Sequence, residues 1–525
     1  MKKETIAQIN SAEDLKETLL SVLSTNGLLA TKAAQIISQL QTDALSWQEK
    51  YQALLGQFKL AQQKRFASSS EKCPGQLGLF DEADNVPAEV ETNTIVVAEH
   101  KRQAQRPKRT VLPEHFPREV IEHDVAEADK VCGCGCQKTR FGAEITEQLD
   151  VMPPKFKVVQ HVRPKYVCKT CQGNISIAPM PKLFLPKSIA APSLVAFTAT
   201  SKYIDHLPLY RQEAMWERYG IKLPRNTTCG WLMKAHEKML PLLPLLKADI
   251  IASGYIQADE TPVQVMRELG RRNQQKSYMW IYRGNAPNHT AVYYEYQETR
   301  AAEHPKKFLA GFQGYLQTDG YGGYDWVDKM QSTIHLGCMA HARRPFAKLI
   351  KLAKGKGQAA VALKWIAQLY AAEEEARENN MSVEQRFELR RNKSVPVLLQ
   401  LKNWLEKIKL STSPQGILGK GIEYMLEHWD VLNHYLLDGR LEIDNNWVEN
   451  DIRPFAVGKK NWLFKGSPLG AKAGACFYSL IATCKANDID PFKYLNYLFT
   501  QLPFCKIEND YRQLLPYNID LNLLK

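Results

Sequence analysis

The sequence has no run of about 18 apolar residues, which is the minimum that a membrane-spanning helix needs. The N-terminal stretch MKKETIAQINSAEDLKETLL also lacks the apolar segment of a secretory signal peptide. These two absences argue against a membrane protein and against a secreted one. We therefore expect a cytoplasmic protein.

Acidic residues are fewer than basic ones: the chain has 56 Asp and Glu against 69 Lys and Arg, so its formal net charge is +13. Such a balance favours a polyanionic partner over an acidic small molecule. The chain has 525 residues, whereas a single hydrophobic core rarely serves more than roughly 250 to 300. We therefore expect several domains.

Cysteines are few, 11 in all, but five of them lie in two tight groups. Cys132, Cys134 and Cys136 form the first group, and Cys168 and Cys171 form the second. In a reducing compartment such groups favour a metal site over disulfides, and four thiolates can surround Zn²⁺. We favour Cys132 and Cys134 as ligands from the first group, with Cys136 as substitute. Free thiols are the alternative.

The N-terminal region, residues 1–72, carries apolar residues at alternating spacings of four and three from Ala33 to Ala61. This heptad pattern predicts a coiled coil that joins copies of the chain, although a helix packed within its own domain would show the same seam. Residues 73–110 should form a linker, acidic first and then basic. Its positive charges between Lys101 and Arg109 suit an arm lying along phosphates, or a solvated tether.

Helical patterning from Pro192 to about Leu246 includes two segments separated by Tyr219, Gly220 and Pro224. This arrangement predicts a helix-turn-helix whose second helix offers its first turn to the major groove of DNA. The candidate contacts are Arg225, Asn226, Thr227 and Thr228. Helical hairpins that bind nothing are also common.

Four segments rich in Tyr, Val, Ile and Trp then predict β-strands: GYIQADETPVQV, SYMWIYRG, TAVYYEYQET and GYLQTDGYGGYD. Asp259 is expected at the end of the apolar strand in YIQADET, and Asp319 at the end of the one in YLQTDGY. Two carboxylates at neighbouring strand ends repel each other unless a cation lies between them, as in two-metal phosphoryl transfer. In an RNase H-like core the chain forms three strands, then a helix, and then a further strand that carries a carboxylate. The predicted segments follow this order.

A third acid is expected from a helix packed across the sheet. Glu449 in DNNWVENDIRP fits, because Asp444 can cap that helix and place Glu449 about one turn in. Glu260 and Glu442 are the rival candidates.

Four basic residues near these acids are further candidates for phosphate contacts: Arg343, Arg344, Lys459 and Lys460. Lys465, close to Trp462 and Phe464, is another. Cys338 and His341 lie three residues apart, but as a metal pair they would lack partners, so we expect them to pack near the site.

Motifs along most of the chain resemble the transposases of the insertion-sequence sixty-six family. They are RFASSSEK, QLGLFDEA, the two cysteine groups, SKYIDHLPLYRQ, DETPVQV, TDGYGGYD, GCMAHARRPF and DNNWVENDIRPFAVGKKNWLF. The resemblance implies a multidomain α/β protein with an RNase H-like DDE catalytic core. Its first, second and third acids would be Asp259, Asp319 and Glu449.

On this resemblance the chain divides into a coiled-coil region (1–72), the linker (73–110), a zinc-binding domain (111–185), a helix-turn-helix region (186–246), a catalytic domain (247–465) with a helical insertion at about 350–430, and a C-terminal helical domain (466–525). Two Mg²⁺ or Mn²⁺ ions and a structural Zn²⁺ are implied. The expected partners are DNA at the element's ends and at the target, further copies of the chain, and small accessory proteins, with the enzyme associated with the nucleoid. A DNA-binding regulator or a nuclease derived from a transposase is the alternative.

Overall fold

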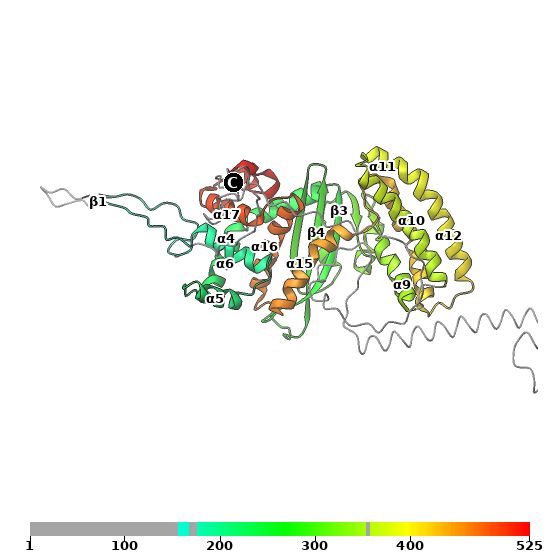
Figure 1. Ribbon diagram of the computed structural model, residues 1–525, viewed down its shortest axis with the longest axis horizontal. Coiled ribbons are helices and arrows are strands. Elements are labelled where there is room, and N and C mark those ends of the chain that lie inside the picture. The colour runs from blue at the N-terminus through cyan, green and yellow to red at the C-terminus, as the bar shows by residue number, and fades with distance from the viewer. Residues whose placement is uncertain (1–155, 167–175, 353–356, 525) are drawn as a thin grey trace, which may run out of the picture. The chain divides into compact units, whose positions relative to one another are not determined.

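The computed structural model describes residues 156–166, 176–352 and 357–524 (Figure 1). Described residues up to Met180 belong to one compact unit, and residues 181–524 belong to another. In the first unit, strands β1 (Lys165–Tyr166) and β2 (Ser176–Ile177) pair in antiparallel fashion. The five clustered cysteines, the heptad seam and the basic arm lie outside the described residues.

The larger unit contains a five-stranded sheet in the order β5-β4-β3-β6-β7. β3, β4 and β5 are antiparallel neighbours, whereas β6 runs parallel to β3 and β7 runs parallel to β6. The strands are β3 (Tyr255–Gln264), β4 (Lys276–Ala286), β5 (His289–Gln297), β6 (Gly314–Gln317) and β7 (Thr333–Leu336). The four predicted strands are confirmed as β3 to β6, with helix α8 (Glu303–Phe308) between β5 and β6. β7 was not predicted.

Helix α16 (Pro468–Ala486) covers the edge strand β5, and its side chains accept hydrogen bonds from main-chain N–H groups of that strand. Ser479 and Thr483 accept hydrogen bonds from the main-chain N–H groups of Tyr294 and Val292 at 2.8 and 3.0 Å. Asn487, one further turn along, accepts from the N–H of Thr290 at 3.1 Å. Residues four apart share one face of a helix, so this polar stripe on an otherwise buried helix protects a strand edge that would otherwise pair with another chain.

Four helices precede the sheet and share one apolar core with it and with the C-terminal helices. They are α4 (Pro192–Tyr203), α5 (Leu209–Arg218), α6 (Arg225–Met239) and α7 (Leu242–Ala252). The predicted break between two helices is confirmed, because α5 ends before Tyr219 and Gly220 adopts a positive φ of 77°. Pro224 immediately precedes α6.

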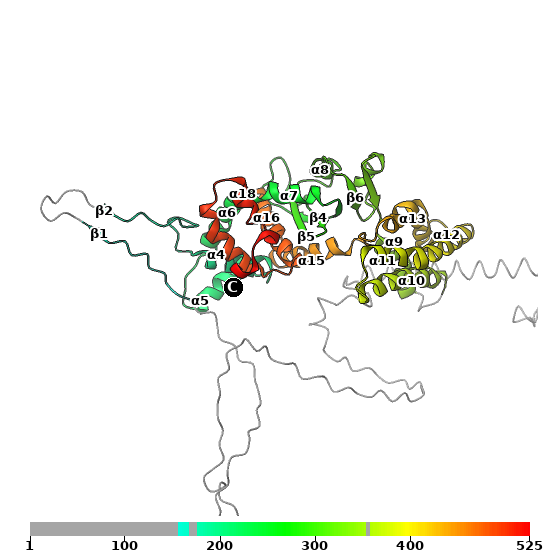
Figure 2. The same ribbon diagram turned by 90° about the horizontal axis from the view of Figure 1, so that it is seen from above.

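A second apolar core belongs to the helices that follow β7, and Figure 2 shows α9 to α13 grouped together. Short helical turns η3 (Gly322–Tyr324) and η4 (Val327–Lys329) precede β7. The group comprises α9 (Met339–Leu352), α10 (Gln358–Glu378), α11 (Val383–Leu389), the π-helical turn η5 (Arg390–Ser394), α12 (Val395–Lys409), α13 (Ile417–Glu427), α14 (Trp429–Asn433) and η6 (His434–Leu437).

Helix α15 (Asn446–Trp462) then returns across β3 and β4 (Figure 1). The remaining elements are α17 (Pro491–Gln501), η7 (Leu502–Phe504), α18 (Glu508–Arg512), η8 (Pro516–Asn518) and η9 (Leu521–Leu524). Among the described residues, none of these helices has the length and apolarity that crossing a bilayer requires.

Candidate active site

The sheet register brings Asp259 and Asp319 together. β3 and β6 are parallel, and Gln257 pairs with Gln317. Asp259 and Asp319 each lie two residues beyond this pair, so the parallel register brings them side by side. Carboxylate oxygens of Asp259, Glu260 and Asp319 all lie within 4.8 Å of one another. Asp319 follows the end of β6, as predicted, but Asp259 lies within β3, which continues to Gln264, so its predicted place at a strand end is wrong. The two aspartates nevertheless share one site, and Glu260 joins them.

Close like charges in a buried setting make the ionised form of Asp259 costly. Burial first, and then the charges of Asp319, Glu260 and Glu449, raise the pKa of Asp259 well above its usual range. The main-chain N–H of Glu260 donates to Asp259 Oδ1 at 2.7 Å, which opposes the rise only in part. An acid cluster of this kind is stabilised by a cation that shares its oxygens.

Glu260 has a partner that the sequence analysis missed. The Arg300 guanidinium donates from Nε to Glu260 Oε1 at 2.6 Å, and it lies 3.5 Å from the centre of the Tyr321 ring. The Glu260 side chain is only 1 % exposed, and its Oε2 makes no hydrogen bond within the described part of the chain. Burial and then Asp319 raise the pKa of Glu260 to about 7.

Glu449 lies in the first turn of α15, as predicted, and its carboxylate contacts residues of α9. Arg344 Nη2 donates to its two oxygens at 3.2 and 3.4 Å, and His341 Nδ1 lies 3.5 Å from Oε1. Burial raises the pKa of Glu449; Arg344 opposes the rise and the charge of Asp319 adds to it. Glu449 is therefore coupled electrostatically to the aspartate pair while it binds to α9.

The expectation that Cys338 and His341 would lack a third metal-ligating group is wrong, because ligand atoms of Cys338, His341 and Glu449 lie within 4.8 Å of one another. The partner comes from 108 residues further along the chain from His341, so local spacing could not show it. The Cys338 sulfur already accepts the main-chain N–H of Asn445 at 3.3 Å. Its thiol is fully buried, and burial raises the pKa of that thiol.

The start of α15 differs in detail from the prediction. Asn445, not Asp444, occupies the N-cap position, but Asp444 Oδ1 does accept the main-chain N–H of Asn446 at 3.1 Å. The rival acid Glu442 lies just before this turn and pairs with Arg386 of α11 at 2.7 Å.

The candidate DNA contacts fall into two classes. Arg225, Asn226 and Thr227 are exposed at the start of α6. Thr228 is only 1 % exposed, and its hydroxyl donates to the Arg225 carbonyl at 3.0 Å. Thr228 is therefore not available on the surface of α6 for contact with a base.

Among the other basic candidates, Lys460 and Arg344 are exposed and Arg343 is half-buried. Lys459 donates to the Pro262 carbonyl at 2.7 Å. Lys465 is only 7 % exposed, and its Nζ lies 4.0 Å from the centre of the Trp462 ring. Because Lys465 is buried, the prediction that it contacts a phosphate is wrong.

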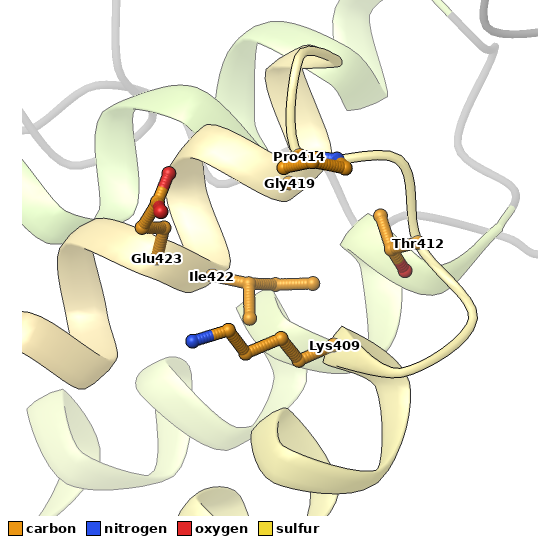
Figure 3. A pocket seen from close by; sticks show the side chains of 6 residues that line it. All are labelled: Lys409, Thr412, Pro414, Gly419, Ile422 and Glu423. Atoms are coloured by element: carbon orange, nitrogen blue, oxygen red, sulfur yellow. The ribbon is translucent and has the colours of Figure 1, made fainter.

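A hollow of about 130 Å³ lies elsewhere, where the end of α12 approaches α13 (Figure 3). Its lining residues are Lys409, Thr412, Pro414, Gly419, Ile422 and Glu423. None of the clustered acids contributes to it, so it is not part of the candidate active site.

Four family models match successive parts of this chain. The description "Transposase IS66 family" matches residues 187–473, "zinc-finger binding domain of transposase IS66" matches 129–172, "IS66 C-terminal element" matches 479–517, and "Transposase C of IS166 homeodomain" matches 53–121. The zinc-finger match spans both cysteine groups. The first match spans the three acids.

Relatives in Sinorhizobium fredii (strain NBRC 101917 / NGR234) are similar over most of the chain. The uncharacterized protein y4jD is 34% identical over 400 residues, which cover 73% of this chain and 76% of the relative. The uncharacterized protein y4qI is 32% identical over 515 residues, which cover 93% of each. The similarity therefore extends well beyond the acid-bearing region.

Proposed function

The chain belongs to the transposase IS66 family, and from this premise we propose that it binds the ends of its insertion sequence and catalyses DNA strand cleavage and strand transfer. The observation that carries the proposal is the convergence of Asp259 and Asp319 from paired parallel strands, with Glu449 coupled to them from α15. We assign all three as the catalytic acids.

We further propose that residues 247–465 form an RNase H-like core with a helical insertion at about 350–430. Three antiparallel strands, a helix and two parallel strands, in the order β5-β4-β3-β6-β7, support this assignment. The acids lie on the first strand, after the fourth, and on the helix that follows the insertion. The other domain boundaries predicted from the sequence are retained as part of the same proposal.

The donor set fits hard divalent cations, because Asp259, Asp319 and Glu449 offer only carboxylate oxygens. Asp259 and Asp319 would hold the ions between them, and Glu449 would complete one of the two ligand sets. Two Mg²⁺ or Mn²⁺ ions, when bound, would supply the activation of water or of a DNA 3′-hydroxyl and the stabilisation of the leaving 3′ oxygen. The oxygens of Glu260 are close enough to assist. The five clustered cysteines would supply four ligands to a structural Zn²⁺.

Basic residues around the acids would hold DNA. Arg344 pairs with Glu449 in the protein alone, and we propose that it turns to a phosphate when cations occupy the acids. Lys460 and Arg343 lie on the neighbouring helices α15 and α9 and would contact the backbone. Exposed Arg225, Asn226 and Thr227 would read base edges at the element's ends. Further copies of the chain and small accessory proteins of the element are expected partners.

The test is incubation of the purified chain with DNA that flanks its gene, with Mg²⁺ or Mn²⁺, followed by mapping of nicked and joined strands. We expect cleavage at the inverted repeats and joining to a target. Cleavage without joining would favour the nuclease alternative. Binding without cleavage under all metal conditions would favour the regulator and contradict the proposal.

A further inference from the structure

The two aspartate-bearing strands repeat one short pattern. Residues 255–259 read YIQAD and residues 315–319 read YLQTD. The pattern repeats in space as well, because Tyr255 pairs with Tyr315 and Gln257 with Gln317 in the parallel register. Residues two apart share one face of a strand, so Gln257 lies on the same face of β3 as Asp259, while Asp319 follows Gln317 just beyond the end of β6. Both glutamine side chains are fully buried.

We propose that Gln257 and Gln317 are positioning residues that fix the start of helix α15, and with it Glu449, against the two aspartates. The inference rests on the proposed function of these acids. It adds two residues to the site that neither touch DNA nor hold an ion. They act through the main chain of residues 442–448.

Gln257 binds this segment at two points. Its Nε2 donates to the main-chain carbonyl of Asp444 at 3.1 Å. Its Oε1 accepts the main-chain N–H of Val448, the residue before Glu449, at 3.3 Å. The Gln257 side chain therefore binds both the residue before the N-cap of α15 and the first turn of that helix. Asn445 adds a reciprocal contact by donating from Nδ2 to the Ala258 carbonyl at 3.0 Å.

Gln317 binds the same segment from β6. Its Nε2 donates to the carbonyl of Glu442 at 2.9 Å and to the carbonyl of Gly337 at 3.0 Å. Its Oε1 accepts from Gln257 Nε2 at 2.8 Å and from the Tyr255 hydroxyl at 2.6 Å. The Tyr255 oxygen in turn accepts the main-chain N–H of Glu442 at 3.2 Å. The two glutamines are thus bonded to each other and to residues 442, 444 and 448.

An amide is the side chain that this network requires. A glutamate would direct an acceptor at the carbonyls of Glu442 and Asp444 and would add a buried charge beside the acids. A methionine has a similar length, but it would leave those carbonyls and the Val448 N–H without partners. The segment would then lose its fixed position relative to β3 and β6. Glu449 would be displaced from Asp259 and Asp319, whose own strands stay paired.

The test compares Gln257→Met and Gln317→Met with the wild-type full-length protein. Binding of Mn²⁺ is measured by electron paramagnetic resonance without DNA, together with thermal melting. We expect each variant to melt cooperatively and to bind Mn²⁺ about 10- to 100-fold more weakly, which is the loss that substitution of outer-sphere partners typically causes. DNA cleavage should need correspondingly more Mn²⁺.

Gln212→Met is the matched control. Gln212 of α5 is also fully buried, and its Nε2 donates to the carbonyls of Thr198 and Leu207 at 3.3 and 3.0 Å, but it does not contact residues 442–448. It should lower the melting temperature and leave Mn²⁺ binding at the wild-type level. If a glutamine variant does not fold, Tyr255→Phe takes its place, because it removes only the hydroxyl that links Gln317 to Glu442. Tyr255→Phe should also weaken Mn²⁺ binding.

Asp259→Asn tests the proposed function independently of the positioning role. If Asp259→Asn loses Mn²⁺ binding while the folded glutamine variants bind Mn²⁺ like the wild type, the positioning role is overturned and the proposed function stands. If Asp259→Asn itself keeps wild-type Mn²⁺ binding and cleavage, the proposed function fails.

Discussion

Three aromatic rings surround the ammonium group of Lys465, a residue that the sequence predicts as a phosphate contact. Its Nζ lies 5.8, 5.9 and 4.0 Å from the ring centres of Tyr203, Phe455 and Trp462. Its main chain bonds to Gln264 and Met266 and forms an isolated parallel bridge with Val265, beside the end of β3. The rings favour the charged form, but burial dominates and lowers the pKa of Lys465 well below its usual value.

Replacement of Lys465 by Met should therefore stabilise the protein near neutral pH. The unfolded lysine holds its proton up to about pH 10.5, whereas the folded lysine gives it up at a lower pH, so this residue costs most stability below its folded pKa and least above 10.5. The gain in melting temperature for Lys465→Met over the wild type should be larger at pH 7 than at pH 10. Equal gains at both pH values would show that the rings keep the ammonium charged.

At the level of elements, the helices between β7 and α15 fix the segment that leads to Glu449. Arg390, in the π-helical turn, is 1 % exposed and donates to both oxygens of Glu373 at 2.8 Å. It also donates to the carbonyls of Tyr435, Asp438 and Leu441 at 2.8, 2.9 and 2.7 Å. The insertion is thus bonded to the chain that enters α15.

Arg390→Met should cost about 3–5 kcal/mol in the free energy of unfolding, because it leaves buried Glu373 with Arg386 as its remaining arginine partner and also removes the donor to the carbonyls of Tyr435, Asp438 and Leu441. Chemical denaturation measures this. Arg391→Met is the control: its pair with Glu388 is 64% and 57% exposed, so its loss should change stability by no more than about 0.5 kcal/mol. Similar losses for the two variants would contradict the account.

Asn226 is exposed in the first turn of helix α6. Asn226→Ala should weaken binding to end DNA by about 1–3 kcal/mol, which is the discrimination that one good base contact supplies, and should leave binding to unrelated DNA nearly unchanged. Competition titrations with both DNAs measure the difference. Lys234→Ala, exposed further along the same helix, should not change the preference. An unchanged preference in Asn226→Ala would remove this residue from base recognition.

The sequence was sufficient for strands β3 to β5, because their Tyr, Val and Ile residues lie in long runs, and for the short strand β6 in its Tyr-rich segment. It also indicated that Asp259 and Asp319 meet, although Asp259 lies within β3 and only Asp319 follows a strand end. It did not reveal β7, whose four residues T-I-H-L lack the tyrosine that marks the equally short β6. The contact of Glu449 with His341 and Arg344 depends on the return of α15 from a distant part of the chain. Burial of Thr228 depends on which face of α6 meets the core. These facts are set by tertiary packing, which local patterns do not encode.

For the molecule as a whole, transposition requires two DNA ends to be held together, and the heptad seam from Ala33 to Ala61 would supply the second copy of the chain. Replacement of Leu40 and Leu54 by Glu should place charges in that seam and release monomers. Light scattering measures the mass. An unchanged mass would assign the seam to packing within one chain.

The central claim is that Asp259, Asp319 and Glu449 carry out the chemistry, and the most direct measurement is strand cleavage of end DNA by Glu449→Gln and Glu442→Gln side by side. Glu449→Gln removes a proposed ion ligand and should lower cleavage by orders of magnitude with end-DNA affinity nearly unchanged. Glu442→Gln alters only the pair with Arg386 and should cleave at close to the wild-type rate. Wild-type cleavage by Glu449→Gln together with loss of cleavage in Glu442→Gln would contradict the assignment of the third acid.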